Sequence, residues 1–355
     1  MVFPDSTHDY LDCLLPICER KIPPGAKTSR LVSDFTPKFN NVMSLQHYQL
    51  LLWLGVQITK IHQVLKFRQG FYMKEYVDIV AEWRSQARDS FSTTLYKDLA
   101  NIIFGKTIES YDNRKNVEIV TSERRLEKLI RKGTYKDRHI CTFPNFTMVI
   151  VESSKGVIKY NRPLINGAMI LSLSKVYLWS FWYKVMKPTF GLGTYICNVD
   201  TDAYLFVVNC PNFFEKIKSI SEHFDLSNLD PEHQLFSNEN RKVLGKLKFE
   251  TSGKKVLAVC CLKSKCYSIL MEDSCIKKLK GIQKDYVKDK ITFEDYKQCV
   301  LNKTKRFATF KNILCKDHQL YTVQQSKLAL ECTDYKRHIL PDGINTLAHG
   351  HFRLR

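Results

Sequence analysis

Apolar residues recur at helical spacing along much of the N-terminal part of the chain. Ser44 is a suitable N-cap, and the pattern after it predicts an amphipathic helix over residues 44–66, which a turn at Gln69-Gly70 would end. Apolar residues three and four positions apart predict a second helical stretch over residues 73–108. We expect the two stretches to form a long antiparallel hairpin.

Short strand-like runs replace the helical spacing in the middle of the chain. A charged helix is expected near residues 123–132. The runs around it have the β-branched and aromatic content of strands, and they cover residues 117–120, 139–143, 147–151 and 157–160. This part of the chain is therefore predicted to form part of a sheet.

A second pair of strands is predicted further along, after an apolar stretch with helical spacing at residues 163–187. The β-rich runs 194–199 and 204–208 flank a tight turn, and that turn holds Asp200 and Asp202. Beyond residue 240, strand-like runs alternate with basic residues. From residue 275 the chain becomes rich in lysine and is expected to be helical through residues 293–301.

Composition and charge restrict the class of protein. With 355 residues, of which 44% are hydrophobic and 12% aromatic, the chain is long and apolar enough for two or three folded units. Its 55 Lys and Arg against 36 Asp and Glu give a net charge of +19, which favours polyanionic partners such as nucleic acid. Many soluble proteins are basic without binding nucleic acid, so the distribution of the charge has to decide.

The cysteines and the longest apolar runs bear on the compartment. Twelve cysteines are scattered along the chain, and the first residues do not resemble a signal peptide, so we expect a reduced, intracellular protein, with the nucleus as one compartment that fits. The clusters Cys13/Cys18 and Cys260/Cys261/Cys266 lack the paired spacing of a structural zinc site. Residues 50–64 are the best candidate for a membrane span but are interrupted by polar residues, so no membrane partner is expected.

The two aspartates of the predicted hairpin turn are the first candidates for chemistry. Asp200 and Asp202 are one residue apart between runs that favour burial. Two like charges about 4 Å apart repel by about 4 kcal/mol at an effective dielectric near 20, so a compensating cation is expected. Carboxylate oxygens with water suit Mg²⁺, whose usual work in proteins is phosphate chemistry. The alternative is an ordinary exposed turn, where Asp is common.

A second candidate set lies near the end of the second helical stretch. Lys97 and Asn101 are four residues apart, which puts both side chains on one face of a helix. Phe104 lies on or near the same face, and Gly105 leaves room for close approach. A cation, an amide and a ring could together meet a nucleotide. The alternative is an ordinary solvated helix face.

A basic track follows the aspartate turn. Lys263, Lys265 and Tyr267 alternate on a predicted strand and would point to one side of it, where they could grip a phosphate backbone. Lys246 and Lys248 extend the track upstream, and the lysines of residues 277–290 extend it downstream. The alternative is a solvated edge strand that lysines protect against aggregation.

These three segments, in this order, resemble motifs of family B DNA polymerases. KDLANIIFG is similar to the fingers motif Lys-x-x-x-Asn-Ser-x-Tyr-Gly, VDTDA to the palm motif Asp-Thr-Asp-Ser, and KCY to the Lys-x-Tyr motif. The resemblance is closer to the protein-primed, virus-like branch, which includes the polymerases of Polinton (Maverick) elements. It extends over essentially the whole chain, through segments such as FGKTIES, YNRPLINGAMILSLSK and ILPDGINTLAHGH.

The resemblance implies an α+β fold with the palm, fingers and thumb of a right-hand polymerase. Its parts would be a palm remnant over residues 1–43, a helical-hairpin fingers domain over 44–105, a palm over 106–270 and a mostly helical thumb over 271–355. It implies a DNA-directed DNA polymerase that adds deoxynucleotides to a primer 3′-hydroxyl with Mg²⁺ as cofactor. The implied partners are primer-template DNA, dNTPs and a priming protein.

The resemblance also assigns roles to single residues. Asp202 would be the principal metal ligand and Asp200 its neighbour. The residues that would hold the triphosphate or lie under the nascent base pair are Lys97, Asn101, Phe104 and Gly105, with Arg84 and Arg88 upstream on the same helix as further phosphate contacts. Lys265 and Tyr267 would follow the primer strand.

The chain departs from the family pattern at several positions. Ile102 stands in place of Ser, Phe104 in place of Tyr, and Ala203 in place of the Ser after the second Asp. Phe3-Pro4 and His8-Asp9 resemble the end of the first palm motif, whose metal-binding Asp would precede Met1. Asp5 and Asp9 lie past that motif and are poor substitutes, and no exonuclease half is present.

Two other functions are alternatives to a polymerase. Without the first-motif Asp, the chain could be a catalytically dead DNA-binding remnant of an integrated viral or transposable element. A nucleotide-sugar transferase also uses an Asp-x-Asp turn, but it has no place for the Lys-x-x-x-Asn helix or the basic track.

Overall fold

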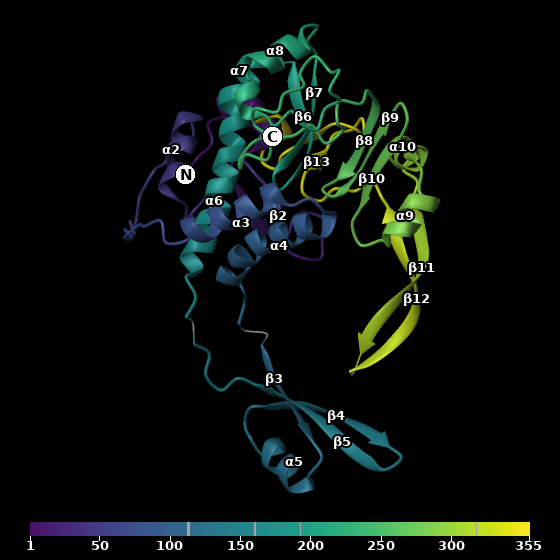
Figure 1. The fold of residues 1–355 in the computed structure, drawn as a ribbon. Helices are drawn as coiled ribbons and strands as arrows, with labels where there is room; N and C mark the ends of the chain where they lie inside the picture. The colour runs from purple at the N-terminus through teal and green to yellow at the C-terminus, as the bar shows by residue number, and fades with distance from the viewer. Residues whose placement is uncertain (112–113, 160, 192, 317) are drawn as a thin grey trace. The chain divides into compact units, whose positions relative to one another are not determined.

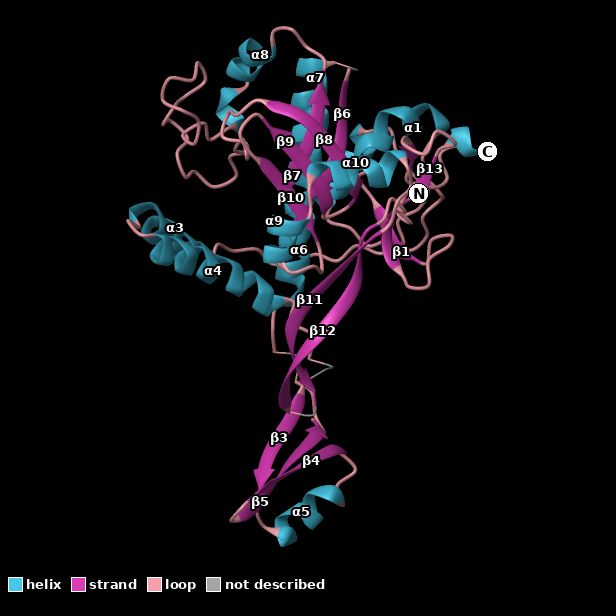
Figure 2. Ribbon diagram, turned by 90° about the vertical axis from the view of Figure 1, so that its right-hand side faces the viewer, coloured by secondary structure: helices cyan, strands magenta, loops and turns pink. Residues whose placement is uncertain are grey.

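Helices and strands alternate along the chain in a mixed α+β fold (Figure 1 and Figure 2). The computed structural model describes residues 1–111, 114–159, 161–191, 193–316 and 318–355. Two compact units result. The first consists of Met1–Gln69, Leu171–Phe310 and Gln325–Arg355, and the second of Gly70–Ile170 and Lys311–Gln324.

The first unit begins with short elements that pack close to the C-terminal end of the chain. They are α1 (Asp5–Leu11), the 3₁₀-helix η1 (Asp12–Leu14), the antiparallel pair β1 (Cys18–Lys21) and β2 (Arg30–Ser33), and α2 (Leu45–Trp53). Ser44 caps α2 as predicted, because its hydroxyl accepts a hydrogen bond from the backbone N–H of His47.

The helix predicted over residues 44–66 is wrong beyond Trp53. Gly55 has a φ of 83°, a left-handed conformation that ends the helix. Gln57 then pairs with Val2 in an isolated β-bridge, which turns the chain back to the N-terminus. This long-range pairing outweighs the local helical pattern, and no helix forms between Gly55 and the start of the second unit among the described residues.

A continuous helix begins in the second unit, and from Leu171 on it forms the centre of the large core of the first unit. It consists of α6 (Leu164–Phe181), the π-helical turn η2 (Trp182–Met186) and α7 (Lys187–Phe190), which confirms the helix predicted over residues 163–187. Trp182, Tyr183 and Met186 are fully buried in η2, and the Tyr183 hydroxyl donates to the Leu14 carbonyl at 2.7 Å. The core also takes in apolar side chains of α1, α2, β6, β7 and α8.

This helix is also the one described segment, Leu164–Phe190, that is long and apolar enough by length and composition to cross a membrane. Its second half carries the fully buried residues of η2, whereas most of the apolar segment is not buried. From the sequence we predicted this helix but named residues 50–64, and not this segment, as the best candidate for a membrane span.

A strand hairpin and a small sheet lie side by side in the first unit (Figure 1). The antiparallel hairpin is β6 (Thr194–Asp200) with β7 (Ala203–Val208), and α8 (Phe213–Ser219) with the 3₁₀-helix η3 (Ser221–His223) follows it. The sheet has the antiparallel order β10-β9-β8, from β8 (Val256–Lys263), β9 (Cys266–Met271) and β10 (Cys275–Leu279). Side chains of α9 (Lys284–Lys290) and α10 (Phe293–Leu301) bury one of its faces.

The family resemblance implied a mostly helical C-terminal part, and the structure contradicts this expectation. Beyond α10 it consists of the long hairpin of β11 (Arg306–Lys316) and β12 (Gln319–Leu330), the pair β13 (His338–Ile339) and β14 (Thr346–Leu347), and the 3₁₀-helix η4 (Phe352–Leu354). β10 also contradicts the helix expected from residue 275. Its lysines suit a helix, but Lys277 and Lys278 pair with Ser268 and Tyr267 of β9.

Two helices pack against each other in the second unit, α3 (Lys74–Gln86) and α4 (Ser90–Thr107) (Figure 2). The Tyr76 hydroxyl donates to the Leu99 carbonyl at 3.0 Å. The single helix predicted over residues 73–108 is therefore a hairpin in itself. Its break comes at Ala87, whose ψ of 126° is not helical. Asp89 then caps α4, because its carboxylate accepts from the Ser92 N–H at 2.7 Å.

The rest of the second unit contains a three-stranded antiparallel sheet with one helix. The order is β3-β5-β4, from β3 (Lys115–Val120), β4 (Tyr135–Phe143) and β5 (Phe146–Ser154), and α5 (Glu123–Ile130) packs on it through Leu129. These elements confirm three of the predicted strands and the charged helix. The fourth predicted strand does not form over residues 157–159, and Tyr160 lies outside the described residues.

The compact units do not follow the expected domain boundaries. The segment 44–105, expected as fingers, divides after Gln69, and the segment 106–270, expected as palm, divides after Ile170. The assignment of palm, fingers and thumb to these units stays a prediction.

Candidate functional site

The predicted aspartate turn connects β6 to β7. Asp200 is the last residue of β6 and pairs with Ala203, the first residue of β7. Thr201 has a φ of 63°, and the Asp202 N–H donates across it to the Asp200 carbonyl at 2.7 Å. A β-branched residue is rarely found at positive φ, and such strained backbone clusters at functional sites. The turn holds its two carboxylates in a tight and strained backbone conformation.

The strands behind the turn are anchored on the central helix. The Tyr204 hydroxyl donates to the Leu178 carbonyl of α6. The Tyr204 ring lies 5.7 Å from that of Trp182, and burial raises the pKa of the Tyr204 hydroxyl. The core therefore fixes the position of the turn while Asp202 remains exposed.

A second hairpin turn meets the first. Lys265 lies in the turn between β8 and β9 with a φ of 59°, and its Nζ is 2.7 Å from Oδ1 of Asp200. Two segments that the sequence singled out separately, VDTDA and KCY, are thus joined by an ion pair. The turn also shows that Lys263, Lys265 and Tyr267 do not share one face of a strand. Lys263 ends β8, and Tyr267 belongs to β9.

The Tyr267 side chain packs between the two hairpins beside the Asp200–Lys265 ion pair. It is 8% exposed and clusters with Leu205 of β7 and Cys261 of β8. Burial raises the pKa of its hydroxyl, and the negative charges of Glu250 and Asp200 raise it further. Tyr267 therefore stays protonated and links the two hairpins by packing.

A basic groove opens beside Asp200 and Lys265. It has a volume of about 510 Å³ and is lined by six lysines and two aspartates, a formal net charge of +4. The lining lysines beyond Lys265 come from β10, α9 and the residues between them: Lys277, Lys278, Lys280, Lys284 and Lys288. A concave surface with this charge attracts phosphate groups.

Lys277 differs from the other lysines of the groove. Its Nζ donates to the carbonyls of Lys288 and Ile291 at 2.6 and 2.7 Å, so it holds the end of α9. From the sequence we recognised this segment only as a lysine-rich extension of the basic track. The signal for its individual residues was the alternation of lysines before α9 and the spacing of Lys284 and Lys288 on one helix face.

Lys246 and Lys248, which were predicted to contact DNA, have partners within the fold. The Lys248 Nζ lies 2.9 Å from Oδ2 of Asp225, whose side chain is 1% exposed, and Lys246 donates to the Glu222 carbonyl. Burial alone would raise the pKa of Asp225, but hydrogen bonds from Ser227 and Lys248 outweigh it and hold that pKa at about 2. Lys246 and Lys248 therefore hold a loop in place. The basic surface beside Asp200 is formed instead by the lysines that line the groove.

The candidate nucleotide-binding residues belong to the second unit, whereas the aspartate turn belongs to the first. Lys97, Asn101 and Gly105 are exposed at successive turns of α4, and Phe104 is half-buried. A Cβ on Gly105 would have no heavy atom within 4 Å, so this face of α4 is open.

Arg84 and Arg88 are not on the same helix as these residues, as we had expected. Arg84 lies on α3, and Arg88 lies in the connection to α4. The break at Ala87 separates Arg84 from the Lys97 face, and Arg88 precedes Asp89, the N-cap of α4.

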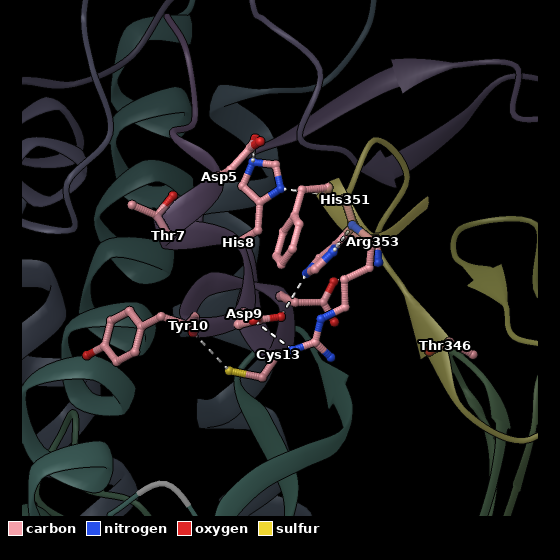
Figure 3. A network of polar contacts seen from close by, with 12 residues as sticks. Asp5, Thr7, His8, Asp9, Tyr10, Cys13, Thr346, His351 and Arg353 are labelled. Atoms are coloured by element: carbon pink, nitrogen blue, oxygen red, sulfur yellow. Dashed lines mark hydrogen bonds and ion pairs between the residues drawn. The ribbon is translucent and has the colours of Figure 1, made fainter. Parts of the chain in front are cut away.

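The acidic residues near the N-terminus form ion pairs with arginines of the C-terminal segment. Figure 3 shows Asp9 beside His351 and Arg353, with Asp9 2.7 Å from the Arg353 guanidinium. Two further pairs of the same kind join Asp5 to Arg355 at 2.9 Å and Asp12 to Arg337 at 2.6 Å. These acids lie close to the segment that resembles the first palm motif, and their partners are arginines.

Asp200 and Asp202 could bind Mg²⁺ only together with ligands from water and a substrate, because the turn supplies two carboxylates. Among the described residues, no three His, Cys, Asp or Glu side chains are grouped so that they could hold a metal ion. Mg²⁺ in phosphate chemistry is commonly bound by one or two carboxylates with water and substrate phosphates. Asp200 and Asp202 supply two carboxylates, and the groove beside them suits the phosphates.

Comparison with known proteins identifies no protein that this chain is similar to. No protein-family model matches the chain. No curated protein and no solved structure matches it either. The residues and their geometry therefore carry the assignment of function.

Proposed function

We propose that the chain is a DNA-directed DNA polymerase similar to the protein-primed, virus-like branch of family B. In this proposal it transfers nucleotides from dNTPs to a primer 3′-hydroxyl on a DNA template. The observation that carries the proposal is the ion pair between Asp200 and Lys265 at the edge of the lysine groove. It joins the two segments that resemble the palm and Lys-x-Tyr motifs, and both would face the primer end in such an enzyme.

In a right-hand arrangement, the β6–β7 hairpin and the strands β8 and β9 would belong to the palm, which would end at residue 270. The α3–α4 hairpin would be the fingers, and residues 271–355, β10 among them, would be the thumb. Lys97 and Asn101 would then hold the triphosphate, with Phe104 and Gly105 under the nascent base pair. Primer-template DNA, dNTPs and a priming protein are the partners that this reading implies, within an intracellular compartment.

The chemistry of the turn follows from its carboxylates. Asp202 and Asp200 would hold Mg²⁺, which activates the primer hydroxyl and stabilises negative charge on the phosphates when it is bound. Asp202 is exposed and therefore accessible to the cation and the triphosphate. The exposed groove lysines, Lys278, Lys280 and Lys284, would position the DNA backbone by their charge.

Primer extension tests this function. The unaltered chain should extend a primer in the presence of Mg²⁺ and dNTPs. Asp202→Ala should reduce the rate at least about 100-fold, because metal stabilisation of a phosphoryl transition state contributes several kcal/mol. Duplex binding, measured by fluorescence anisotropy, should persist in this variant because the groove lysines are unchanged.

The matched control is Asp273→Ala. Asp273 is an exposed aspartate in the turn between β9 and β10, and it pairs with Lys254 at 2.7 Å. Its replacement should leave extension unchanged. Equal loss in both variants would show a nonspecific effect and contradict the role of Asp202.

A catalytically inactive DNA-binding protein, such as a remnant of an integrated viral or transposable element, is the second candidate. The observation that favours it is the set of arginine partners of Asp5, Asp9 and Asp12, together with the two carboxylates at the turn. Two-metal transfer commonly uses carboxylates from more than one segment. Duplex binding without any extension by the unaltered chain would establish this alternative.

A further inference from the structure

We propose that Lys265 is an exchangeable counter-ion that couples the lysine groove to cation binding at the aspartate turn. In the absence of a ligand it neutralises Asp200. When a phosphate backbone enters the groove, the ammonium moves to a phosphate and leaves Asp200 open to a divalent cation. The inference rests on the proposed function in one respect, since it takes Asp200 and Asp202 as the cation site.

The ion pair has the properties of a contact that exchanges readily. The Nζ of Lys265 lies 2.7 Å from Oδ1 of Asp200, and the two side chains are 46% and 30% exposed. Ion pairs in such partly solvated positions contribute little to stability, because water screens them and the side chains lose freedom. A divalent cation or a phosphate can therefore displace one partner at small cost.

The backbone of Lys265 is fixed while its side chain can move. The Lys265 carbonyl accepts a hydrogen bond from the Lys280 N–H at 3.1 Å, and the turn connects two paired strands. The side chain is a flexible four-carbon stem that ends in a point charge. It lines the groove together with Lys278, Lys280 and Lys284, so a phosphate held by those lysines would be a natural second partner.

Competition at Asp200 makes the two binding events interdependent. A cation that binds Oδ1 of Asp200 has to displace the Lys265 ammonium, and a polyanion in the groove offers that ammonium another partner. Each ligand therefore favours the other, and by linkage the effect is reciprocal. Without the Lys265 charge, the cation should bind more tightly on its own, and the polyanion should help it less.

Isothermal titration calorimetry of the full chain with Mg²⁺ tests the coupling. The titration is made with and without a DNA duplex whose recessed 3′ end is dideoxy-terminated, so that no chemistry can occur. Lys265→Met removes the charge and keeps the length of the side chain. Without DNA it should bind Mg²⁺ about twofold to fivefold more tightly than the unaltered chain, the range expected for a solvated ion pair. DNA should then increase its Mg²⁺ affinity by a smaller factor than it does in the unaltered chain.

Two further variants make the result specific. Lys284→Met removes another charge from the same groove, and it should weaken DNA binding while changing DNA-free Mg²⁺ affinity by less than about twofold. Asp200→Asn should abolish both the Mg²⁺ binding and the coupling. Retention of Mg²⁺ binding in Asp200→Asn would overturn the assignment of the site.

The inference would also be overturned if Lys265→Met bound Mg²⁺ no more tightly than the unaltered chain, or if DNA changed the affinity equally in both. These readouts are independent of catalysis. A chain that fails to extend primers and still shows the coupling would retain the inference and refute the proposed polymerase activity. A chain that extends primers but shows no coupling would retain the proposed polymerase activity and refute the inference.

Discussion

Lys248 and Lys265 illustrate how burial separates residues that look alike in the sequence. Each pairs with an aspartate, but Asp225 beside Lys248 is 1% exposed and Asp200 beside Lys265 is 30% exposed. A buried carboxylate depends on its partner for stability, whereas a solvated one can exchange it. The local sequence predicted both lysines as phosphate contacts, because the burial of each aspartate is set by residues distant in the chain.

Asp225→Asn should lower the free energy of unfolding by about 2 kcal/mol at neutral pH, because the native pKa of about 2 lies below the ordinary value of 3.8. That stabilisation is fully present above about pH 3.8 and is lost as the pH falls towards 2. Urea unfolding of both proteins measures it. Asp273→Asn is the control, since its carboxylate is 60% exposed and should contribute little. Equal effects of the two substitutions would contradict the structural role of Asp225.

Local patterns predicted the elements whose pairing is local. The runs 194–199 and 204–208 correspond closely to β6 and β7, because alternation and a tight turn determine a hairpin. The helix 293–301 coincides with α10, which Thr292 caps. The strand β10 was not predicted, because it forms by pairing with β9 and its lysines carry no strand signal. Nor was the break at Ala87 predicted, since alanine strongly favours helices.

Packing between helices determines whether Gly167 and Gly105 can be replaced by a residue with a Cβ. A Cβ on Gly167 of α6 would lie 2.1 Å from Cγ2 of Ile108 and 2.3 Å from Oγ1 of Thr107, the last residue of α4. Gly167→Ala should therefore destabilise the chain by about 1–3 kcal/mol through overpacking. Gly105→Ala has open space around it and should stabilise α4 by up to about 1 kcal/mol.

Chemical denaturation of both glycine variants compares the two positions. A neutral Gly167→Ala would show that α4 and α6 do not approach this closely. Gly105→Ala has a second use, because a stable variant with impaired nucleotide incorporation would support the role proposed for this face of α4.

On the scale of the whole molecule, the two ends of the chain are joined through buried histidines. Nδ1 of His8 accepts from the Phe352 N–H at 3.0 Å, which joins the two ends. Within the C-terminal segment, Nδ1 of His351 accepts from the Arg353 N–H at 3.2 Å (Figure 3). The acceptor nitrogen of His351 has to be unprotonated for this hydrogen bond. No sequence pattern indicated the contact of His8 with Phe352, because it joins residues at opposite ends of the chain.

Acid should weaken the joined ends. Burial lowers the pKa of His351 from its ordinary value of 6.5, although Asp12 and Asp9 oppose the shift and His8 and Arg353 assist it. A histidine with a lowered native pKa binds its proton more readily when unfolded. The free energy of unfolding should therefore be unaffected by this group above about pH 6.5 and should fall below it.

Urea unfolding at about pH 7.5 and about pH 5.5 measures the acid effect. His351→Asn keeps an acceptor for the Arg353 N–H and cannot titrate in this range, so it should reduce the difference between the two pH values. The same pH dependence in this variant would assign the effect to another group.

The most direct measurement is the identity of the nucleotide that the chain adds. The substrates are duplexes that differ only in the first unpaired template base, with Mg²⁺ and single dNTPs. Template-directed transfer at Asp200 and Asp202 predicts addition of the complementary nucleotide to each duplex, and loss of that addition in Asp202→Ala. Addition that ignores the template base, or that survives Asp202→Ala, would contradict the assignment of a polymerase site to the aspartate turn.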